Sequence, residues 1–276
     1  MDKKRILVVT QDLDPYIEDS VAAKLINDLA VGSYKKGVDI RILMPRFGTI
    51  NERRHRLHEV VRLSGINIII EDDDYPLLIK VASLPNARLQ VYFLDNEDFF
   101  SRKSTFTDKE GKLYDDNAER MVFFCRGVLE TVRKFGWAPD IVHCHGWMTS
   151  LVPMFMRTAY KKDPIFENSK LVYSIYDKSF EGSLPNELLK KAQINRVVAE
   201  DLTVYGDATY SDLEAGAISY SDALVKAVPG IKEDVEKMMD ESDKPLLQDL
   251  DEETFVDQYL AFYDSLLEKE ATVEDE

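Results

Sequence analysis

The chain has 276 residues, 45% of them hydrophobic, which is enough to bury a sizeable core in one large domain or in one domain with an appendage. No stretch approaches the roughly 20 apolar residues of a membrane span. The N-terminal MDKKRILVVTQ has too few apolar residues for a signal-peptide core, so we expect a cytoplasmic protein. Cys125 and Cys144 are too few cysteines for a disulfide framework or a cysteine-rich zinc site.

The net charge of −16 is concentrated near the C-terminus. Residues 233–276 carry 17 acidic side chains against three lysines, which leaves the first 232 residues at −2. A nucleic-acid-binding domain needs a basic surplus to neutralise phosphates, so this class is excluded. The one basic segment is RFGTINERRHR, residues 46–56, whose arginines form either a solvated face or an anion site.

The first elements along the chain alternate between strand and helix. Residues 5–10 (RILVVT) are typical of a buried strand, and residues 20–37 have the apolar spacing of an amphipathic helix that ends at Gly37. Residues 38–45 (VDIRILMP) predict the next strand. A strand, helix and strand in this order predict a parallel sheet with helices on both faces.

Residues 66–96 contain three β-rich runs that are separated by DDDYP and PNA. Turn residues between short runs are typical of strands joined by tight connections. We therefore expect a small antiparallel or mixed β insertion on the sheet.

The remaining elements continue the alternation, with no internal repeat. They are a helix over 117–136 that buries Cys125, a strand over 140–145, a helix over 148–162, a strand over 170–177, and a helix and strand pair over 211–228. The fold class is therefore α/β, with a single Rossmann-like, doubly wound and mostly parallel sheet over residues 1–232.

The acidic residues 233–276 are predicted to form a linker and a C-terminal helix. Between residues 246 and 270 an aromatic and aliphatic stripe recurs at helical spacing opposite an acidic face; its members are Phe255, Tyr259, Phe262, Tyr263, Leu266 and Leu267. Such a stripe predicts a packing face. We expect this helix to pack back on the domain, with residues 238–245 as the joining linker.

Two histidines flank a cysteine in PDIVHCHGWMTSLVP, residues 139–153. On a strand, His143 and His145 lie on one face and Cys144 on the other. This separation argues against a three-ligand metal site and against a Cys–His nucleophile pair. We expect no metal and no cofactor.

The same motif ends a central parallel strand, where open α/β sheets bind their ligands. A helix that Thr149 or Ser150 could cap follows directly. His143 is expected to be packed, whereas His145 either lines a pocket or is packed as well.

Four segments resemble bacterial glycogen synthases and plant starch synthases. The stretch WAPDIVHCHGWMTSLVP (137–153) is similar to their W-x-P-D-[IV]-[IV]-H-x-H-D-W-x-[TA]-x-L-x-P, and YDDNAERMVFF (114–124) to their Y-x-D-N-x-x-R-F. GVDIRILMPRFG (37–48) resembles G-h-x-V-x-V-x-x-P-x-[YF]-[GP], and the first strand followed by DPY resembles S-x-E-x-x-P. The resemblance implies the GT-B architecture, in which two Rossmann domains face each other and glucose passes from ADP-glucose to an α-1,4-glucan with retention of configuration.

The resemblance also implies roles for individual residues. His145 falls on the active-site histidine that contacts the transferred glucose, and Asp116 and Asn117 fall on an Asp-Asn pair near the acceptor and the sugar. Trp147 keeps the family's tryptophan, while Gly146 replaces its aspartate.

The segment that follows the first strand departs from the family. Relatives carry K-T-G-G-L, where this chain reads EDSVA: Glu18 replaces the lysine, Asp19 follows, and Ser20 and Val21 replace the glycines that let the backbone approach the nucleotide sugar. A carboxylate repels a diphosphate. We therefore expect a degenerate donor loop.

Two further departures concern the sugar site and the second domain. Tyr176 and Asp177 replace the histidine and asparagine of the family's I-H-N. The family's Q-G that follows corresponds to Glu181 and Gly182, so that only the glycine is kept. We expect the second Rossmann domain, which supplies the family's phosphate clamp and catalytic glutamate, to be missing. The C-terminal helix resembles the crossover helix that ends that domain.

These features predict a non-catalytic relative that binds α-glucan or maltooligosaccharide, or that scaffolds or regulates a full-length synthase chain. The alternative is an ADP-glucose-dependent α-1,4-glucan glucosyltransferase, active alone or completed by a partner chain, which would also bind ADP-glucose. A third hypothesis is a degenerate relative without any ligand. Neither nucleic acid nor a membrane is expected as a partner.

Overall fold

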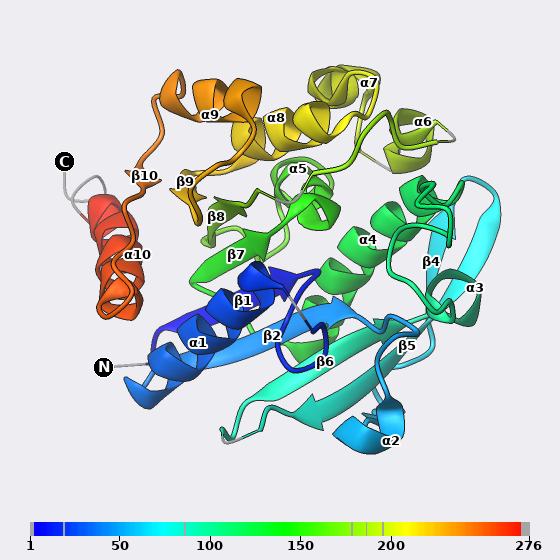
Figure 1. Cartoon of the computed structure of the whole chain (residues 1–276), viewed down its shortest axis with the longest axis horizontal. Helices are drawn as coiled ribbons and strands as arrows, with labels where there is room; N and C mark the ends of the chain where they lie inside the picture. Colours follow the sequence, from blue (N-terminus) through cyan, green and yellow to red (C-terminus); the bar gives the residue numbers. More distant parts are fainter. Residues whose placement is uncertain are drawn as a thin grey trace.

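Figure 1 shows the computed structural model of the chain, which describes residues 3–18, 20–85, 87–177, 179–185, 187–194 and 196–271. One mostly parallel sheet forms its centre, in the order β10-β9-β8-β7-β1-β2-β6-β5-β3, with β4 paired to β5. The parallel strands are β1 (Arg5–Thr10), β2 (Asp39–Pro45), β6 (Gln90–Asp95), β7 (Ile141–His145), β8 (Lys170–Ile175), β9 (Ala223–Lys226) and β10 (Leu246–Leu247).

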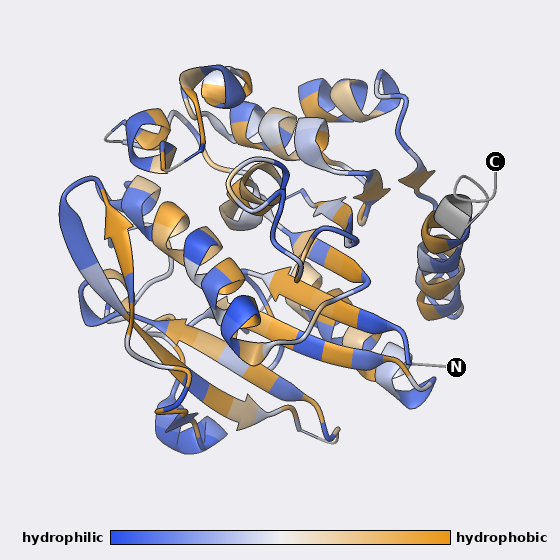
Figure 2. Cartoon of the chain, turned by 180° about the vertical axis from the view of Figure 1, so that it is seen from behind, coloured by the Kyte–Doolittle hydropathy of each residue, from blue (hydrophilic) through white to orange (hydrophobic). Residues whose placement is uncertain are grey.

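Helices cover both faces of the sheet, as the alternating pattern predicted. In Figure 1 α1 (Val21–Lys35) lies in front of the sheet, and α4 (Asn117–Phe135) lies in front of it in the reverse view of Figure 2. The helix α10 (Phe255–Ala271) packs against α1, while α5 (Leu151–Arg157) packs against α4 and α8 (Tyr210–Tyr220). The strands between these layers are largely apolar (Figure 2), so the core lies on both sides of the sheet.

Shorter helices decorate the edges and the loops. They are α2 (Glu52–His55), α3 (Glu97–Phe100), α6 (Leu188–Ala192), α7 (Ala199–Leu202) and α9 (Glu233–Asp240), with 3₁₀ turns η1 (Trp147–Thr149) and η2 (Thr203–Tyr205). No helix in the described ranges combines the length and the apolar character that crossing a bilayer requires.

The β insertion expected in residues 66–96 is present and mixed. β4 (Ile66–Ile70) and β6 both run antiparallel to β5 (Asp73–Ser83), and β3 (His58–Glu59) adds a short antiparallel edge. β6 itself runs parallel to β2. The third of the three β-rich runs therefore belongs to the parallel sheet, and β5 is the strand that runs opposite to it.

The helix predicted over residues 148–162 is shorter than the pattern indicated. α5 ends at Arg157, and the chain then makes turns up to Asp163 and Pro164. The backbone leaves the helical region at Thr158 (φ −118°, ψ −86°), whose hydroxyl donates to the Met154 carbonyl at 2.7 Å. Ser150 is the N-cap residue of α5, as predicted, but its side chain makes no capping hydrogen bond, and Thr149 donates its hydroxyl to the Gly146 carbonyl (2.8 Å).

The residues after 232 are more structured than a linker. Residues 238–240 lie in α9, which packs on α8 with Met239 buried, and β10 adds a strand beside β9. The linker predicted over residues 238–245 therefore begins only after Asp240. The sheet itself extends beyond the boundary that we drew at residue 232.

The C-terminal helix α10 buries its aromatic stripe against the domain. Tyr259, Tyr263 and Leu266 are fully or almost fully buried, while the other stripe residues are partly buried against the same core. A Cβ atom on Gly32 of α1 would lie 2.8 Å from the side chain of Val256, so the missing side chain lets the two helices approach closely. The last residues of the chain, 272–276, lie outside the described ranges.

Candidate functional site

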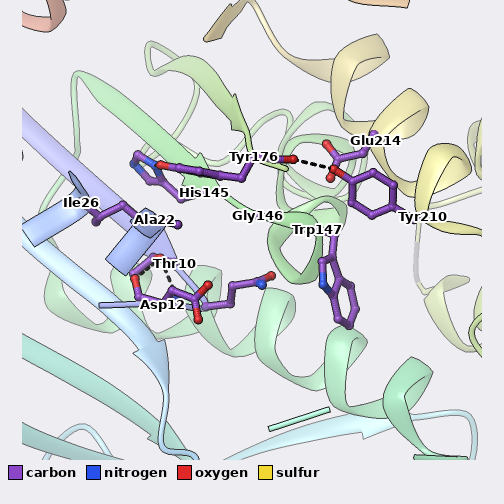
Figure 3. Close-up of a pocket in the computed structure, with 11 residues that line it drawn as sticks. Thr10, Asp12, Ala22, Ile26, His145, Gly146, Trp147, Tyr176, Tyr210 and Glu214 are labelled. Atoms are coloured by element: carbon purple, nitrogen blue, oxygen red, sulfur yellow. Dashed lines mark hydrogen bonds between the residues drawn. The ribbon is translucent and has the colours of Figure 1, made fainter. Parts of the chain in front are cut away.

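A small cavity lies where the strand order of the sheet reverses. From β1 the chain proceeds to β2 and β6 on one side, whereas β7, β8 and β9 follow on the other side. Ligands of open α/β sheets bind at the carboxyl ends of strands at this switch point. The cavity has a volume of ≈ 10 Å³, room for about one water molecule, and is lined by Thr10, Gln11, Asp12, Ala22, Ile26, His145, Gly146, Trp147, Tyr176, Tyr210 and Glu214 (Figure 3).

His145 ends β7 in the wall of this cavity. Its ring is fully buried, and Nδ1 lies 2.8 Å from the hydroxyl oxygen of Tyr176. Nε2 has no hydrogen-bond partner among the described residues. Burial lowers the pKa of His145 to about 3, so the ring is neutral near pH 7. His145 therefore lines the pocket and offers one unused polar atom.

His143 is a packed histidine, as predicted, with both ring nitrogens in use. Nδ1 lies 2.6 Å from the hydroxyl of Tyr263, and Nε2 lies 2.7 Å from the hydroxyl of Ser174. Burial lowers its pKa well below the usual value, and the neighbouring His145 adds to the effect. The two imidazole centroids are 3.8 Å apart, which confirms that both rings share one face of β7.

Cys144 is buried beside Cys125 of α4, away from the histidine rings, and burial raises the pKa of its thiol well above the usual value. A thiol kept protonated in this way is a poor nucleophile. Among the described residues no group of three or more His, Cys, Asp or Glu side chains is placed to hold a metal ion.

Gly146 has φ = +82°, a region that side chains rarely adopt. A Cβ atom at this position would lie 2.8 Å from the Gln11 side chain. That side chain is held in place because its Oε1 accepts a hydrogen bond from the Met148 backbone N–H at 3.0 Å. At the position where the family has an aspartate, this chain therefore has no side chain, and the Gln11 side chain lies against the backbone of Gly146.

The charge reversal predicted after β1, where Glu18 replaces the family's lysine, lies on the protein surface. The Glu18 side chain is 64% exposed and pairs with Arg54 of α2, with 3.1 Å between the oxygen and the nitrogen. Ser20 caps α1 by accepting from the Ala23 backbone N–H at 3.2 Å, and Val21 is 70% exposed. Asp19, the fourth residue predicted for this loop, lies outside the described residues. Glu18 and Val21 thus project from the start of α1.

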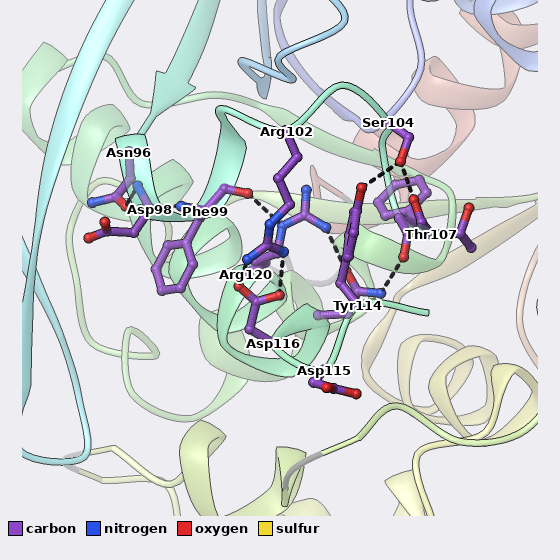
Figure 4. Close-up of polar contacts among 12 residues, drawn as sticks. Asn96, Asp98, Phe99, Arg102, Ser104, Thr107, Tyr114, Asp115, Asp116 and Arg120 are labelled. Carbon is purple, nitrogen blue, oxygen red and sulfur yellow. Dashed lines mark hydrogen bonds and ion pairs between the residues drawn. The ribbon is translucent and has the colours of Figure 1, made fainter. Parts of the chain in front are cut away.

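The Asp-Asn pair at the start of α4 is held by arginines (Figure 4). Asp116 receives two hydrogen bonds from Arg102, at 2.5 and 2.6 Å. Asn117 is buried, donates to the Phe106 carbonyl at 2.8 Å and accepts from Arg120 at 2.6 Å. Burial lowers the pKa of Arg120 to about 10, so this cation stays charged inside the protein. Both members of the pair are engaged by protein groups.

The remaining candidates differ in their exposure. Trp147 is almost fully buried between Phe106 and Phe180, with ring centroids 4.7 and 5.0 Å away. Tyr176 is also buried and occupies the space between His145 and α8, whereas Asp177 is exposed. The structure thus brings His145, Trp147 and Tyr176 together at one cavity. The other described candidates lie outside its lining; they are Asp177, Asp116, Asn117, Glu18, Ser20 and Val21.

Two cavity neighbours were missed by the sequence reasoning. Glu214 of α8 is buried in the wall with Oε2 unpartnered among the described residues, and burial raises its pKa to about 8 against the opposing effect of Tyr173 and Tyr210. Its spacing of four from Tyr210 placed both on one helix face, which was a usable signal. The contact of Tyr263 with His143 joins residues that are 120 positions apart in the sequence, and no local sequence pattern predicts it.

A Rossmann sheet of this order with a histidine-lined cavity at its switch point is the arrangement of one domain of a GT-B glycosyltransferase. Residues 5–248 match the family described as the starch synthase catalytic domain, and the chain therefore belongs to this family.

Relatives and solved structures agree with this membership. The chain is 38% identical to a glycogen synthase of Chlorobium phaeobacteroides over 188 residues, which are 68% of this chain and 38% of that protein. It is 35% identical to a glycogen synthase of Chlorobium phaeovibrioides over 233 residues, 84% of this chain and 47% of that protein. The chain thus spans less than half the length of these relatives.

The fold resembles that of the catalytic domain of starch synthase IV from Arabidopsis thaliana bound to ADP and acarbose. The TM-score is 0.71 at 15% identity, over 90% of this chain and 51% of that chain. A sucrose-phosphate synthase from Thermosynechococcus elongatus has a TM-score of 0.50 at 10% identity, over 89% of this chain and 47% of that chain. At these identities the likeness concerns the fold alone.

Proposed function

We propose that this chain is a cytoplasmic, glycogen synthase-like protein that binds α-1,4-glucan and does not catalyse glucose transfer by itself. In this role it scaffolds or regulates glucan synthesis, in company with a full-length synthase chain. Membership of the starch synthase family supports the glucan as its ligand. The division into residues 1–232 and an acidic segment over 233–276 is part of the same proposal, with β10 of that segment in the sheet and α9 and α10 packed on the domain.

The observation that carries the non-catalytic assignment is the charge around the cavity. Its lining includes the carboxyl groups of Asp12 and Glu214 and no lysine or arginine. Glu18, where relatives carry a lysine, adds a further carboxylate at the start of α1. Transfer from a nucleotide sugar requires positive charge or directed N–H groups to stabilise the departing diphosphate. Near pH 7 the buried Glu214 keeps its proton, so the wall sets the carboxyl group of Asp12 beside a diphosphate and offers it no positively charged side chain.

The size of the cavity supports the same assignment. A hexose does not fit into ≈ 10 Å³. Contact between a sugar and His145 would require Tyr176 or Trp147 to leave its buried position, with the loss of the Tyr176 hydrogen bond at 2.8 Å. The main role of the five candidate side chains is then to shape the end of the sheet; they are His145, Trp147, Tyr176, Asn117 and Asp116.

The alternative is an ADP-glucose-dependent glucosyltransferase. Calorimetry on the whole chain, with ADP-glucose and with maltoheptaose as ligands, distinguishes it from the proposed function. We expect heat of binding with maltoheptaose and none with ADP-glucose. A variant that restores the family loop, Glu18→Lys with Ser20→Gly and Val21→Gly, is expected to gain affinity for ADP-glucose. Glycine at the cap position of α1 costs only a few tenths of a kcal/mol, so the variant should fold.

One result of the calorimetry would contradict the proposed loss of donor binding. Wild-type protein that binds ADP-glucose as tightly as the restored variant would show that the loop substitutions do not disable the donor site. Loss of maltoheptaose binding in His145→Ala and Trp147→Ala, with an unchanged melting temperature, would instead indicate that the cleft opens to admit a sugar.

A further inference from the structure

A second cavity lies at the edge of the sheet opposite the cavity of His145, where strands β2 and β6 begin. Its volume is ≈ 560 Å³, within the range of ligand pockets, roughly 300–1,000 Å³. In Figure 2 these strand ends extend beyond α4, toward the side on which the N-terminus is marked. The helix therefore leaves this end of the sheet uncovered.

The polar part of the cavity lining occupies one face of three neighbouring strands. Ser83 of β5 lies beside Gln90 of β6, and Leu43 of β2 lies beside Tyr92 of β6. Side chains two residues apart on a strand share a face. One face of the sheet therefore carries five polar lining residues; they are Asp39 and Arg41 of β2, Ser83 of β5, and Gln90 and Tyr92 of β6. Arg88, in the segment that joins β5 to β6, adds a sixth polar member.

Arg41 is held in place by aromatic rings and not by a carboxylate. Its guanidinium carbon lies 4.6 Å from the ring centroid of Phe135 and 4.6 Å from that of Trp137. Trp137 is fixed in turn, because its Nε1 donates a hydrogen bond to Asp39 at 3.0 Å. Stacking uses the flat face of a guanidinium and leaves its N–H groups free to donate. Arg41 makes no hydrogen bond or ion pair within the described part of the chain, so these donors are available to a ligand.

The cavity carries a surplus of positive charge, although the chain as a whole is acidic. Arg88 is exposed and, like Arg41, has no carboxylate partner among the residues that the structure describes. Asp39 is the one acidic residue among the described lining residues. Burial lowers the pKa of Arg41, and the charges of Arg5 and Arg62 act in the same direction, which places two more cations nearby. Such a concentration of guanidinium groups attracts an anion.

We propose that this cavity binds a small phosphomonoester, whose phosphate group is held by Arg41 and Arg88. Guanidinium groups bind phosphate oxygens through paired N–H donors. A phosphomonoester has a charge of about −1.5 to −2 near pH 7, which two unpaired arginines match. Because this ligand is not a glucan, the site goes beyond the proposed function and does not depend on it.

The other polar side chains of the lining suit the same ligand. Gln90 accepts the hydroxyl proton of Tyr92 through Oε1 at 2.8 Å, so its amide NH₂ remains free to donate. The Ser83 hydroxyl is a further donor on the same face. A phosphate has three oxygens to satisfy after esterification, and the two arginines with these neutral donors supply partners for all of them. The rest of the cavity has room for the organic part of the ester.

The two tryptophans of the chain report where a ligand binds. Trp137 lies against Arg41 at this cavity, whereas Trp147 lines the cavity of His145. The probe is glycerol 3-phosphate, titrated into the whole chain and followed by the indole N–H resonances in NMR. We expect the Trp137 resonance to shift to saturation and the Trp147 resonance to stay in place. Glycerol, which has no phosphate, should move neither resonance.

Substitution of either arginine should weaken binding. Arg41→Gln and Arg88→Gln are each expected to raise the dissociation constant for glycerol 3-phosphate about tenfold, the effect of losing a charged hydrogen-bond partner. Arg88 is exposed, so Arg88→Gln tests the site even where loss of the stacked Arg41 side chain impairs folding. Arg53→Gln is the matched control, because Arg53 is exposed on α2 outside the cavity lining and its loss changes the net charge equally. Its affinity should equal that of wild type.

Other results would overturn the proposal. They are no shift of Trp137 at millimolar glycerol 3-phosphate, a shift confined to Trp147, or equal weakening by Arg53→Gln and by the two cavity variants. An equal response to acetate would show a general attraction of anions. Inorganic phosphate that binds as tightly as glycerol 3-phosphate would assign the cavity to free phosphate and would contradict a site for the ester.

Discussion

The hydroxyl of Tyr263 lies 2.6 Å from Nδ1 of His143, so that the C-terminal helix α10 holds one of the two histidines of β7. The His143 ring in turn lies 3.8 Å from that of His145. The wall of the cavity therefore depends on a residue 120 positions away in the sequence.

Removal of the Tyr263 hydroxyl should destabilise the protein. Tyr263→Phe leaves Nδ1 of a buried histidine without its partner, and we expect a loss of about 1–3 kcal/mol in the free energy of unfolding. Tyr259→Phe is the matched control, because Tyr259 is equally buried on the same helix and its hydroxyl is not hydrogen-bonded to His143. Urea unfolding of both variants tests this, and equal losses would contradict the assigned role of the Tyr263 contact.

The buried histidines should make the protein sensitive to acid. The pKa of His145 is lowered to about 3 in the folded state, so below pH 6.5 the unfolded chain binds more protons than the folded one. Stability is therefore present above pH 6.5 and is lost as the pH falls toward 3. Relative to wild type, His145→Gln should show a pH slope of unfolding free energy that is smaller by about 1.4 kcal/mol per pH unit between pH 6 and 4.

The control for the acid experiment is His58→Gln, since His58 is exposed on β3. Its unfolding free energy should follow the wild-type pH curve. Parallel curves for His145→Gln and wild type would show that His145 does not remain neutral in the folded state.

Glu214 should act in the opposite pH direction. Burial raises its pKa to about 8, so the folded state keeps a proton that the unfolded chain releases above pH 4.5. Its contribution to stability is complete below pH 4.5 and is lost as the pH rises to 8. Glu214→Gln, which is always neutral, should gain up to about 4 kcal/mol over wild type between pH 5 and 8. The exposed Glu241→Gln serves as control, and a pH-independent difference would contradict the raised pKa.

The family's aspartate should not fit at position 146. Gly146→Asp places a side chain at φ = +82° and 2.8 Å from Gln11, and we expect a loss of about 1–3 kcal/mol. Adding Gln11→Ala removes the clash but not the backbone strain, so the double variant should recover part of the loss. A double-mutant cycle by urea unfolding measures this coupling. Strictly additive effects would show that the two residues do not compete for space.

The sequence predicted those features that depend on local patterns. Strands β1, β2 and β7, helix α4 with Gly136 at its end, and the shared face of His143 and His145 followed from apolar spacing and strand alternation. The family was recognisable because four motifs keep their order along the chain, and the match over residues 5–248 confirms it.

Features that depend on contacts between distant residues did not follow from the sequence. The filling of the cavity by Tyr176, the clamp of Arg102 on Asp116, and the pairing of Glu18 with Arg54 each join side chains from separate segments. The length of α5 was overestimated because apolar residues continue past Arg157, although the chain turns before Pro164. The burial of Asn117 could not be read from its motif.

The central claim is that this chain binds glucan without transferring glucose. The most direct measurement combines sedimentation of the purified whole chain with glycogen and incorporation of labelled glucose from ADP-glucose into that glycogen in the same sample. We predict that the protein sediments with glycogen and that incorporation stays at the level of a sample without protein. Incorporation above that level, proportional to protein concentration and abolished in His145→Ala, would contradict the claim and identify the chain as a glucosyltransferase.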